Sequence, residues 1–125
     1  MKNNMIGSHK FLKTYNGITA FCNIELKSVP NDTWILEWID ITSHLRLLYN
    51  SAVERGVEIA KEAYIKLGGT PQKITIKSLS YTVSDTKPDA VTCSTAIALW
   101  NAWCLPKSFV NIFFEANEWH VKFNR

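Results

Sequence analysis

The side chains that most often do chemistry in enzymes, histidine and serine, are scattered along this sequence. His9, His44 and His120 are separated by tens of residues, and none has a cysteine or carboxylate partner at the spacing of a metal site or a catalytic triad. Ser84 and Ser94 lie outside any G-x-S-x-G sequence, the turn that exposes a nucleophilic serine. We therefore expect surface or second-layer histidines, no catalytic residues, no metal and no enzymatic activity.

Carboxylates and glycines give no stronger motif. Asp85 and Asp89 flank the expected start of a helix, where a carboxylate satisfies free backbone N–H groups and interacts favourably with the helix dipole. Helix capping is therefore favoured over paired acid–base catalysis. The chain contains no GxxxxGK[ST] phosphate loop, so we expect neither nucleotide nor any other cofactor to be bound.

The three cysteines, Cys22, Cys93 and Cys104, are odd in number and share no CxxC or Cys/His spacing. This excludes a disulfide framework and a zinc site as the organising feature. Cys22 falls on the apolar side of an expected strand, and the other two fall within an expected apolar helix, so we interpret all three as core residues. A reducing cytoplasm is the simplest location for such a chain.

The aromatic residues suggest where a partner could bind. Trp34, Trp38, Trp100 and Trp103 fall in elements that should pack together and are expected in the core. Trp119 is the best candidate for an exposed aromatic side chain. With Lys122 and Arg125 nearby it could stack on a base or anchor a protein partner. The same terminal segment could form a homodimer through an edge strand.

The chain has 125 residues and a mass of 14.3 kDa, enough for a single domain over residues 1–125. The first sixteen residues hold Lys2, Lys10 and Lys13 and no acidic residue, whereas the remainder has eleven basic and eleven acidic residues. The N-terminal segment that holds these three lysines is therefore expected to be mildly basic and solvated, with weak affinity for phosphate, and residues 1–9 are expected to form a flexible arm. No segment has the length and apolar character of a membrane helix, so no membrane partner is expected.

Hydrophobic periodicity predicts the elements. Residues 18–26 alternate apolar and polar, and Asn16-Gly17 before them favours a tight hairpin with residues 10–15. Residues 34–41 predict a second long strand, antiparallel to the first. Helical spacing then begins at about Thr42 and continues to Leu67, and Gly56 in its middle predicts close approach to something bulky, such as a sheet face bearing tryptophan.

The second half of the chain repeats this alternation of strand and helix. Residues 72–83 alternate with a parity switch near Ser78, which predicts a bulge or bend. Residues 90–104 predict a strongly buried helix, and residues 109–114 and 119–123 predict a terminal hairpin. The fold class is therefore α+β, a mostly antiparallel sheet with two helices packed on one face.

Several segments in this order resemble domain IV of translation elongation factor G. These are ELKSVP at 25–30, AVERGVE at 52–58 opening a helix, Gly68-Gly69, the strand at 74–76 and the small-residue helix at 91–102. The resemblance covers roughly 85 residues and implies the ribosomal protein S5 domain 2-like fold, with a left-handed βαβ crossover.

The resemblance also implies where a partner would bind. In that family, loops at the tip of the domain reach into RNA at the decoding centre. The corresponding loops here are residues 14–17 and 84–89, and with the flanking Lys13 they give four candidate tip residues. These residues are Lys13, Asn16, Asp85 and Lys87. Val83 and Ser84 occupy the stretch in which the family has a tip histidine.

Two hypotheses of function follow. The first is a non-enzymatic binding protein that contacts RNA or a ribosome-associated partner through the tip loops. The alternative is a small protein-interaction module, such as an immunity or antitoxin-type protein, which the neutral body of the chain favours. A basic stripe formed by Lys13, Lys73, Lys77 and Lys87 would favour the first, and an exposed aromatic patch around Trp119 would favour the second.

Overall fold

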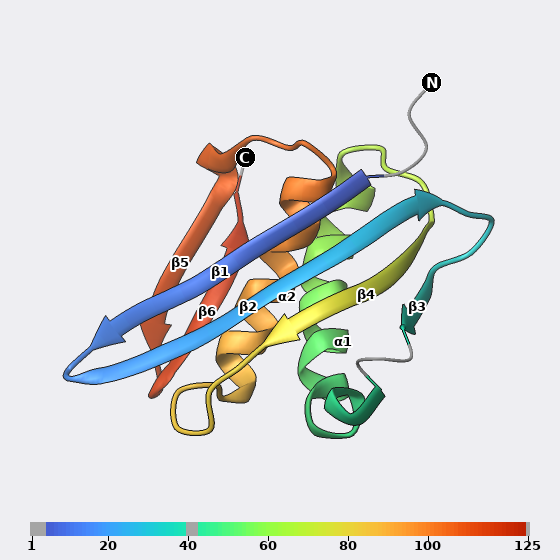
Figure 1. Ribbon diagram of the computed structural model, residues 1–125. Helices are drawn as coiled ribbons and strands as arrows, with labels where there is room; N and C mark the ends of the chain where they lie inside the picture. The colour runs from blue at the N-terminus through green and yellow to red at the C-terminus, as the bar shows by residue number, and fades with distance from the viewer. Residues whose placement is uncertain (1–4, 40–42, 125) are drawn as a thin grey trace.

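The computed structural model describes residues 5–39 and 43–124, and it forms an α+β fold (Figure 1). A four-stranded sheet has the order β1-β2-β4-β3, and β5 and β6 form a separate two-stranded sheet. The elements are β1 (Met5–Tyr15), β2 (Ile18–Pro30), β3 (Ile35–Trp38), α1 (Ser43–Lys66), β4 (Gln72–Ser80), α2 (Pro88–Ala102), the 3-10 turn η2 (Lys107–Phe109), β5 (Val110–Glu115) and β6 (Glu118–Phe123). The expected fold class is confirmed.

Strand β1 begins earlier than expected. Met5 pairs with Ser28 and His9 with Ile24, so residues 5–9 extend the β1–β2 hairpin and do not form a solvated arm. A Cβ on Gly7 would lie 2.0 Å from the carbonyl oxygen of Ala98, because this part of β1 packs directly on α2. Residues 1–4 of the expected arm lie outside the described residues, as do Asp40, Ile41, Thr42 and Arg125.

Strand β3 corrects one expectation about the sheet. It is short, and it pairs with β4 in parallel, Leu36 opposite Ile74, where a long strand antiparallel to β2 was expected. Alternating apolar residues predict a strand but do not say which neighbour it pairs with. In Figure 1 the four-stranded sheet lies in front of both helices, and the path from β3 through α1 to β4 makes a left-handed crossover. Nearly all such connections are right-handed, so this is a distinctive feature of the fold.

Helix α1 matches the predicted helix, and Gly56 lies at a close contact. The neighbour is helix α2, not a tryptophan on the sheet: a Cβ on Gly56 would lie 2.6 Å from the carbonyl oxygen of Thr92 and 2.7 Å from Cβ of Thr95. The Thr92 hydroxyl donates to the carbonyl oxygen of Ala52 at 2.9 Å. The glycine therefore lets the two helices come into backbone contact.

The bulge predicted in the strand after α1 is present. Ser78 pairs with Glu25 and Ile76 with Leu26, so Lys77 is the extra residue between two adjacent positions of β2. Because of this extra residue, both Ile76 and Leu79 are buried on the helix side. The bulge explains the parity switch in the sequence.

Helix α2 is the centre of the molecule. Its side chains are buried almost without interruption from Ala90 to Trp100. The hydroxyl of Ser94 lies close to the carbonyl oxygens of His9 at 2.8 Å and Cys22 at 3.1 Å, and these hydrogen bonds allow a buried serine to pack against two strands. Trp100 stacks on Phe123 of β6 with ring centroids 4.0 Å apart, so the terminal hairpin packs on this helix.

The tryptophans and cysteines mostly confirm the core assignment. Trp100 and Trp103 are buried, while Trp34 and Trp38 are half-buried against the core. Burial raises the pKa of the Cys22 thiol and of the Cys93 thiol to about 12. Cys104 is the exception: it is exposed and follows α2 with a φ of 55°.

The end of α2 explains why Cys104 is outside the core. Its N–H donates to the carbonyl oxygen of Asn101 at 3.0 Å, and the N–H of Leu105 donates to that of Trp100 at 3.2 Å. These two hydrogen bonds form a Schellman cap, in which the residue at the position of Cys104 takes a left-handed conformation and leaves the helix.

Among the described residues, no helix is long and apolar enough to cross a membrane.

Candidate partner-binding tip

The turn between β1 and β2 forms one end of the molecule (Figure 1). Asn16 and Gly17 have φ values of 53° and 77°, the left-handed pair that a two-residue hairpin turn needs. The turn holds Tyr15 and Ile18 opposite each other, and their side chains are 46% and 55% exposed. The expected hairpin is confirmed, and its turn presents two apolar side chains to solvent.

The loop between β4 and α2, residues 81–87, is fixed to the edge of this hairpin. The N–H of Phe21 donates to the carbonyl oxygen of Asp85 at 3.0 Å, and the hydroxyl of Thr86 donates to the carbonyl oxygen of Phe21 at 2.6 Å. Within the loop, the N–H of Thr82 donates to the Thr86 hydroxyl at 2.9 Å. Thr86 is buried, so these hydrogen bonds are shielded from water and hold the loop against β2.

The fixed loop carries apolar side chains outward. Val83 is 94% exposed, and Tyr81, also exposed, lies against Tyr49 of α1 with ring centroids 5.9 Å apart. Leu47 and Leu48 are exposed in the first turns of α1. We call the side chains of Tyr15, Ile18, Tyr81 and Val83 the tip surface.

The terminal hairpin reaches the same end through an aromatic cluster. Tyr15 stacks on Phe114 of β5 with centroids 4.4 Å apart, and Trp119 lies edge-on to Phe11 at 5.9 Å and to Phe114 at 5.2 Å. Trp119 is therefore half-buried in contacts with β1 and is not the free aromatic side chain that was expected. The aromatic cluster joins the hairpin to the sheet.

The structure brings together only some of the predicted site residues. Asn16 forms the tip turn, Lys13 is exposed on β1 near it, and Asp85 and Lys87 belong to the fixed loop, Lys87 exposed just before α2. Lys122 is exposed on β6, on the opposite side of that strand from Trp119, and β6 runs away from the tip. Dimerisation through an edge strand stays a prediction.

The tip carries charges of both signs. Lys13 lies on β1, Asp85 and Lys87 belong to the loop after β4, and Glu115 and Glu118 are the strand ends on either side of the β5–β6 turn. Lys73 lies at the start of β4, far from the tip, in an ion pair with Glu37 at 3.5 Å. The lysines of the hypothetical basic stripe are therefore separated in space.

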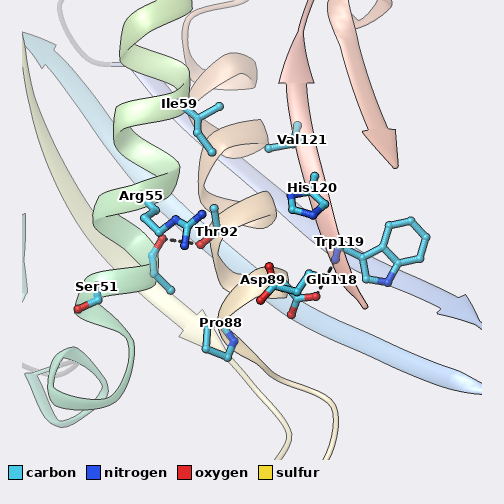
Figure 2. Close-up of a pocket in the computed structure, with 11 residues that line it drawn as sticks. Ser51, Arg55, Ile59, Pro88, Asp89, Thr92, Glu118, Trp119, His120 and Val121 are labelled. Atoms are coloured by element: carbon cyan, nitrogen blue, oxygen red, sulfur yellow. Dashed lines mark hydrogen bonds between the residues drawn. The ribbon is translucent and has the colours of Figure 1, made fainter. Parts of the chain in front are cut away.

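A cleft of about 190 Å³ lies beside the tip, between α1, the start of α2 and β6 (Figure 2). Asp89 lies in its wall, where one carboxylate oxygen accepts from the N–H of Ala90 at 2.9 Å and the other from the N–H of Trp119 at 2.8 Å. This carboxylate lies in the first turn of α2, where capping was expected, but the N–H of Ala90 also donates to the carbonyl oxygen of Lys87 at 3.0 Å, and the N-cap residue Lys87 makes no side-chain cap. Because both oxygens are engaged, Asp89 joins α2 to β6.

Other polar side chains line the cleft from α1 and β6. Arg55 and Glu118 line it from α1 and β6, and the His120 ring stacks on Phe113 at 5.2 Å and has its Nε2 3.0 Å from the carbonyl oxygen of Glu115. In residues 5–39 and 43–124, no three His, Cys, Asp or Glu side chains converge as metal ligands.

Comparisons with known proteins give one structural match. No family model matches the sequence, and no curated protein matches it. A crystal structure of a protein from Thermus thermophilus matches with a TM-score of 0.60 and 25% sequence identity over 78% of this chain. The match covers 15% of the Thermus chain, so this protein corresponds to a small part of a much longer one.

Sequence reasoning missed Thr86, which fixes the tip loop, and the apolar exposure of Val83. A threonine in a polar loop looks like surface, because its bond to Phe21 joins residues far apart in the sequence. The signal that was available is the Tyr81–Val83 stretch: two large apolar residues directly before a turn, beyond the last residue that the sheet can bury.

Proposed function

We propose that this protein is a non-enzymatic binding module that docks on a protein partner through its tip surface. The observation that carries the proposal is the exposure of Val83, 94%, on a loop fixed by Thr86. An apolar side chain held in water gains free energy when a partner covers it. Because the loop is already ordered, binding loses little conformational entropy.

The composition of the tip surface supports a protein partner over a nucleic acid. Tyr15 and Tyr81 are of the residue type most enriched at the centres of protein interfaces. Asp85 in the loop after β4, and Glu115 and Glu118 at the β5–β6 turn, add negative charge that would repel a phosphate backbone.

The fold supports an arm-like role for the tip. The left-handed β3–α1–β4 crossover, the fixed loop after β4 and the match to part of a longer Thermus chain agree with the resemblance to domain IV of elongation factor G and to the ribosomal protein S5 domain 2-like fold. On this basis a ribosome-associated protein is the first partner class to test. A toxin, bound by an immunity or antitoxin-type protein, is the second.

Direct RNA binding is a second candidate function, favoured by one observation. Lys13 and Lys87 are both exposed at the tip end, where the resemblance places contacts with RNA. Two cations would give a weak, salt-dependent interaction. This candidate therefore predicts a dependence on ionic strength that the protein-docking proposal does not.

The test is photo-crosslinking from the tip in extracts of the native cell. A photoreactive amino acid replaces Val83 in one protein and Ile65 in another; Ile65 is 49% exposed near the end of α1 away from the tip and is the matched control. We expect one defined protein adduct from position 83 and none from position 65, unchanged by ribonuclease. Adding excess unlabelled protein should abolish the adduct, whereas the Val83→Asp variant should compete poorly.

Other outcomes decide between the candidates. An adduct that disappears with ribonuclease, together with RNA binding lost at high salt and in a Lys13→Glu, Lys87→Glu variant, would replace protein docking with RNA binding. Equal adducts from positions 83 and 65 would show that the tip surface is not the docking site.

A further inference from the structure

A second surface, at the side of the sheet, has backbone groups free to pair with another strand. β3 is the edge strand next to β4. The N–H of Ile39 donates to the carbonyl oxygen of Ile76 at 3.3 Å, and the direction of these groups alternates along a strand. The N–H and C=O groups of Leu36 and Trp38 therefore face away from β4, and within residues 5–39 and 43–124 no strand pairs with them.

A groove of about 300 Å³ lies beside this edge, between β3 and α1. Its centre is apolar, formed by Leu36, Val57 and Ile74. Ile35, at the start of β3, also lines it and is 39% exposed. We call these residues with the free side of β3 the edge groove.

Both ends of the edge groove are bounded by interactions that place a carboxylate there. At one end, Nε1 of Trp38 donates to Asn50 at 3.0 Å, and the amide of Asn50 donates to Glu54 at 3.1 Å. At the other, Lys61 lies 5.4 Å from the centre of the Trp34 ring and 3.6 Å from Glu58. Glu54 has no ion pair among the described residues, so one acidic group is left without a cation.

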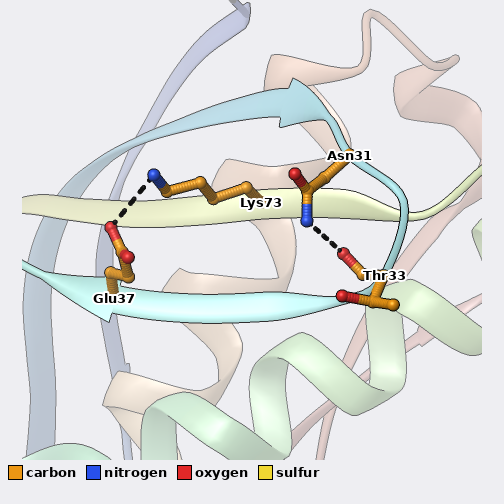
Figure 3. Close-up of polar contacts among 4 residues, drawn as sticks. All are labelled: Asn31, Thr33, Glu37 and Lys73. Atoms are coloured by element: carbon orange, nitrogen blue, oxygen red, sulfur yellow. Dashed lines mark hydrogen bonds and ion pairs between the residues drawn. The ribbon is translucent and has the colours of Figure 1, made fainter.

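The edge itself is held in place before any ligand binds (Figure 3). The side-chain amide of Asn31 donates to the carbonyl oxygen of Thr33 at 2.8 Å, which fixes the turn into β3. Lys73 of β4 pairs with Glu37 of β3 at 3.5 Å on the face opposite the groove. An arriving strand would therefore meet an ordered template.

We propose that the edge groove binds an extended peptide, which adds to β3 as a further strand. The free groups of Leu36 and Trp38 select an extended backbone, because only a strand offers donors and acceptors at their spacing. Alternate peptide side chains would point toward α1. One would be apolar and fill the centre of the groove, and another, two positions away, would be Lys or Arg and pair with Glu54.

This inference concerns a site separate from the tip and does not depend on the proposed function. The edge groove lies on the other side of α1 from the cleft of Figure 2, and no residue is shared between the edge groove and the tip surface. If the crosslinking experiment at the tip fails, the proposal for the edge groove still stands. If the peptide experiment at the edge groove fails, the proposal for the tip surface still stands.

The test uses synthetic peptides with the whole protein. Fluorescent peptides of serine and threonine carry one Leu and one Lys two positions apart, in either order, and binding is followed by anisotropy and by amide chemical shifts. We expect saturable binding with shifts at Leu36, Trp38 and Val57. Methylating the peptide nitrogens that would pair with β3 should weaken binding about tenfold. Replacing the Lys of the unmethylated peptide by Glu should also weaken binding, because Glu54 would then repel the peptide.

A matched pair of variants tests the charge. Glu54→Gln should weaken binding of the Lys peptide about threefold, whereas Glu62→Gln, an exposed position on α1 outside the groove, should leave it unchanged. Binding that shows this charge dependence supports the site, whichever order of Leu and Lys the peptide has. No binding at about 1 mM peptide, or equal binding of the methylated peptide, would overturn the proposal. Concentration-dependent shifts at Leu36 without peptide would instead assign the edge to a second copy of the chain.

Discussion

Cys22 and Cys93 lie in the core with the pKa of each thiol raised to about 12 by burial, whereas Cys104 lies exposed beyond the end of α2. Only a thiolate reacts quickly with disulfide reagents. We expect one thiol per chain to react with Ellman's reagent in the folded protein and the other two only in denaturant. Cys104→Ser should remove the fast reaction, and a fast reaction that survives this substitution would contradict the burial of the other two.

His9 makes the stability of the fold depend on pH. Burial, and then the charges of Lys13 and Lys107, lower its pKa below the ordinary value of 6.5. The unfolded chain therefore binds a proton at a higher pH than the folded chain, and stability falls as the pH drops below about 6.5. Urea unfolding between about pH 7.5 and 5 should show this loss, and His9→Gln should reduce it.

The control for His9 is His44→Gln, because this histidine is exposed near the start of α1. That variant should keep the pH dependence of the parent protein. If His9→Gln and the parent lose stability equally over this range, a group other than His9 is responsible.

At the level of single residues, sequence reasoning succeeded where burial follows local periodicity. Cys22 and Trp100 are buried as predicted. It failed for Trp119, because the residues that cover it, Phe11 and Tyr15, come from the other end of the chain. Alternation along β6 gives the two sides of the strand but does not say what packs on each side.

Gly56 lies where the two helices meet, and replacing it by alanine tests whether packing or helix propensity dominates there. The two effects change the free energy of unfolding in opposite directions. Replacing an interior helix glycine by alanine normally stabilises by about 1 kcal/mol. Here the new Cβ would lie 2.6 Å from the backbone oxygen of Thr92, so the helices must separate. We expect Gly56→Ala to destabilise the protein by about 1–3 kcal/mol in chemical denaturation.

A suitable control is Ser51→Ala, at an exposed position of the same helix. Helix propensity favours alanine there, and nothing crowds the side chain, so stability should stay the same or rise slightly. Stabilisation by Gly56→Ala would show that α1 and α2 are farther apart than described.

Elements were predicted well where one pattern covers many residues. The long helix α1, the β5–β6 hairpin and the bulge in β4 follow from periodicity and its interruption. Buried polar residues were not foreseen: Ser28 and Gln72 are buried because they hydrogen-bond each other at 2.7 Å across β2 and β4. The sequence does not reveal that these two residues are hydrogen-bond partners, because they lie far apart in it. Each therefore resembles an ordinary surface position.

The terminal hairpin contributes to the stability of the whole molecule. Phe123 covers Trp100, and Trp119 covers Phe11, although no backbone ladder joins β5 or β6 to the main sheet. Ending the chain after Pro106 would expose these core aromatics. We expect loss of several kcal/mol and of the cooperative thermal transition.

The matched control is Lys122→Ala, which removes an exposed side chain from the same hairpin. Its stability should stay within about 0.5 kcal/mol of the parent protein. If the shortened chain melts as cooperatively as the full chain, the hairpin is an appendage and the four-stranded sheet with its two helices is sufficient.

For the molecule as a whole, periodicity predicted the class of the fold but not which strands pair, whereas the left-handed crossover was implied by the resemblance alone. The order of elements indicated helices on one face of a mostly antiparallel sheet, which the structure confirms. The parallel pairing of β3 depends on which edge of β4 is free, and β2 already occupies the other edge. The sequence pattern of residues 35–38 does not indicate which edge of β4 is available for pairing.

The direction of the first and last strands has a practical consequence. β1 runs toward the Asn16-Gly17 turn and β6 runs away from it, so Met5 and Phe123 both lie at the end of the molecule remote from that turn (Figure 1). A tether attached beyond either strand end would therefore leave the β1–β2 turn facing outward. Immobilising the protein on a sensor surface through an N-terminal or a C-terminal tag should give the same orientation, with the distal loops free to meet molecules in the flow.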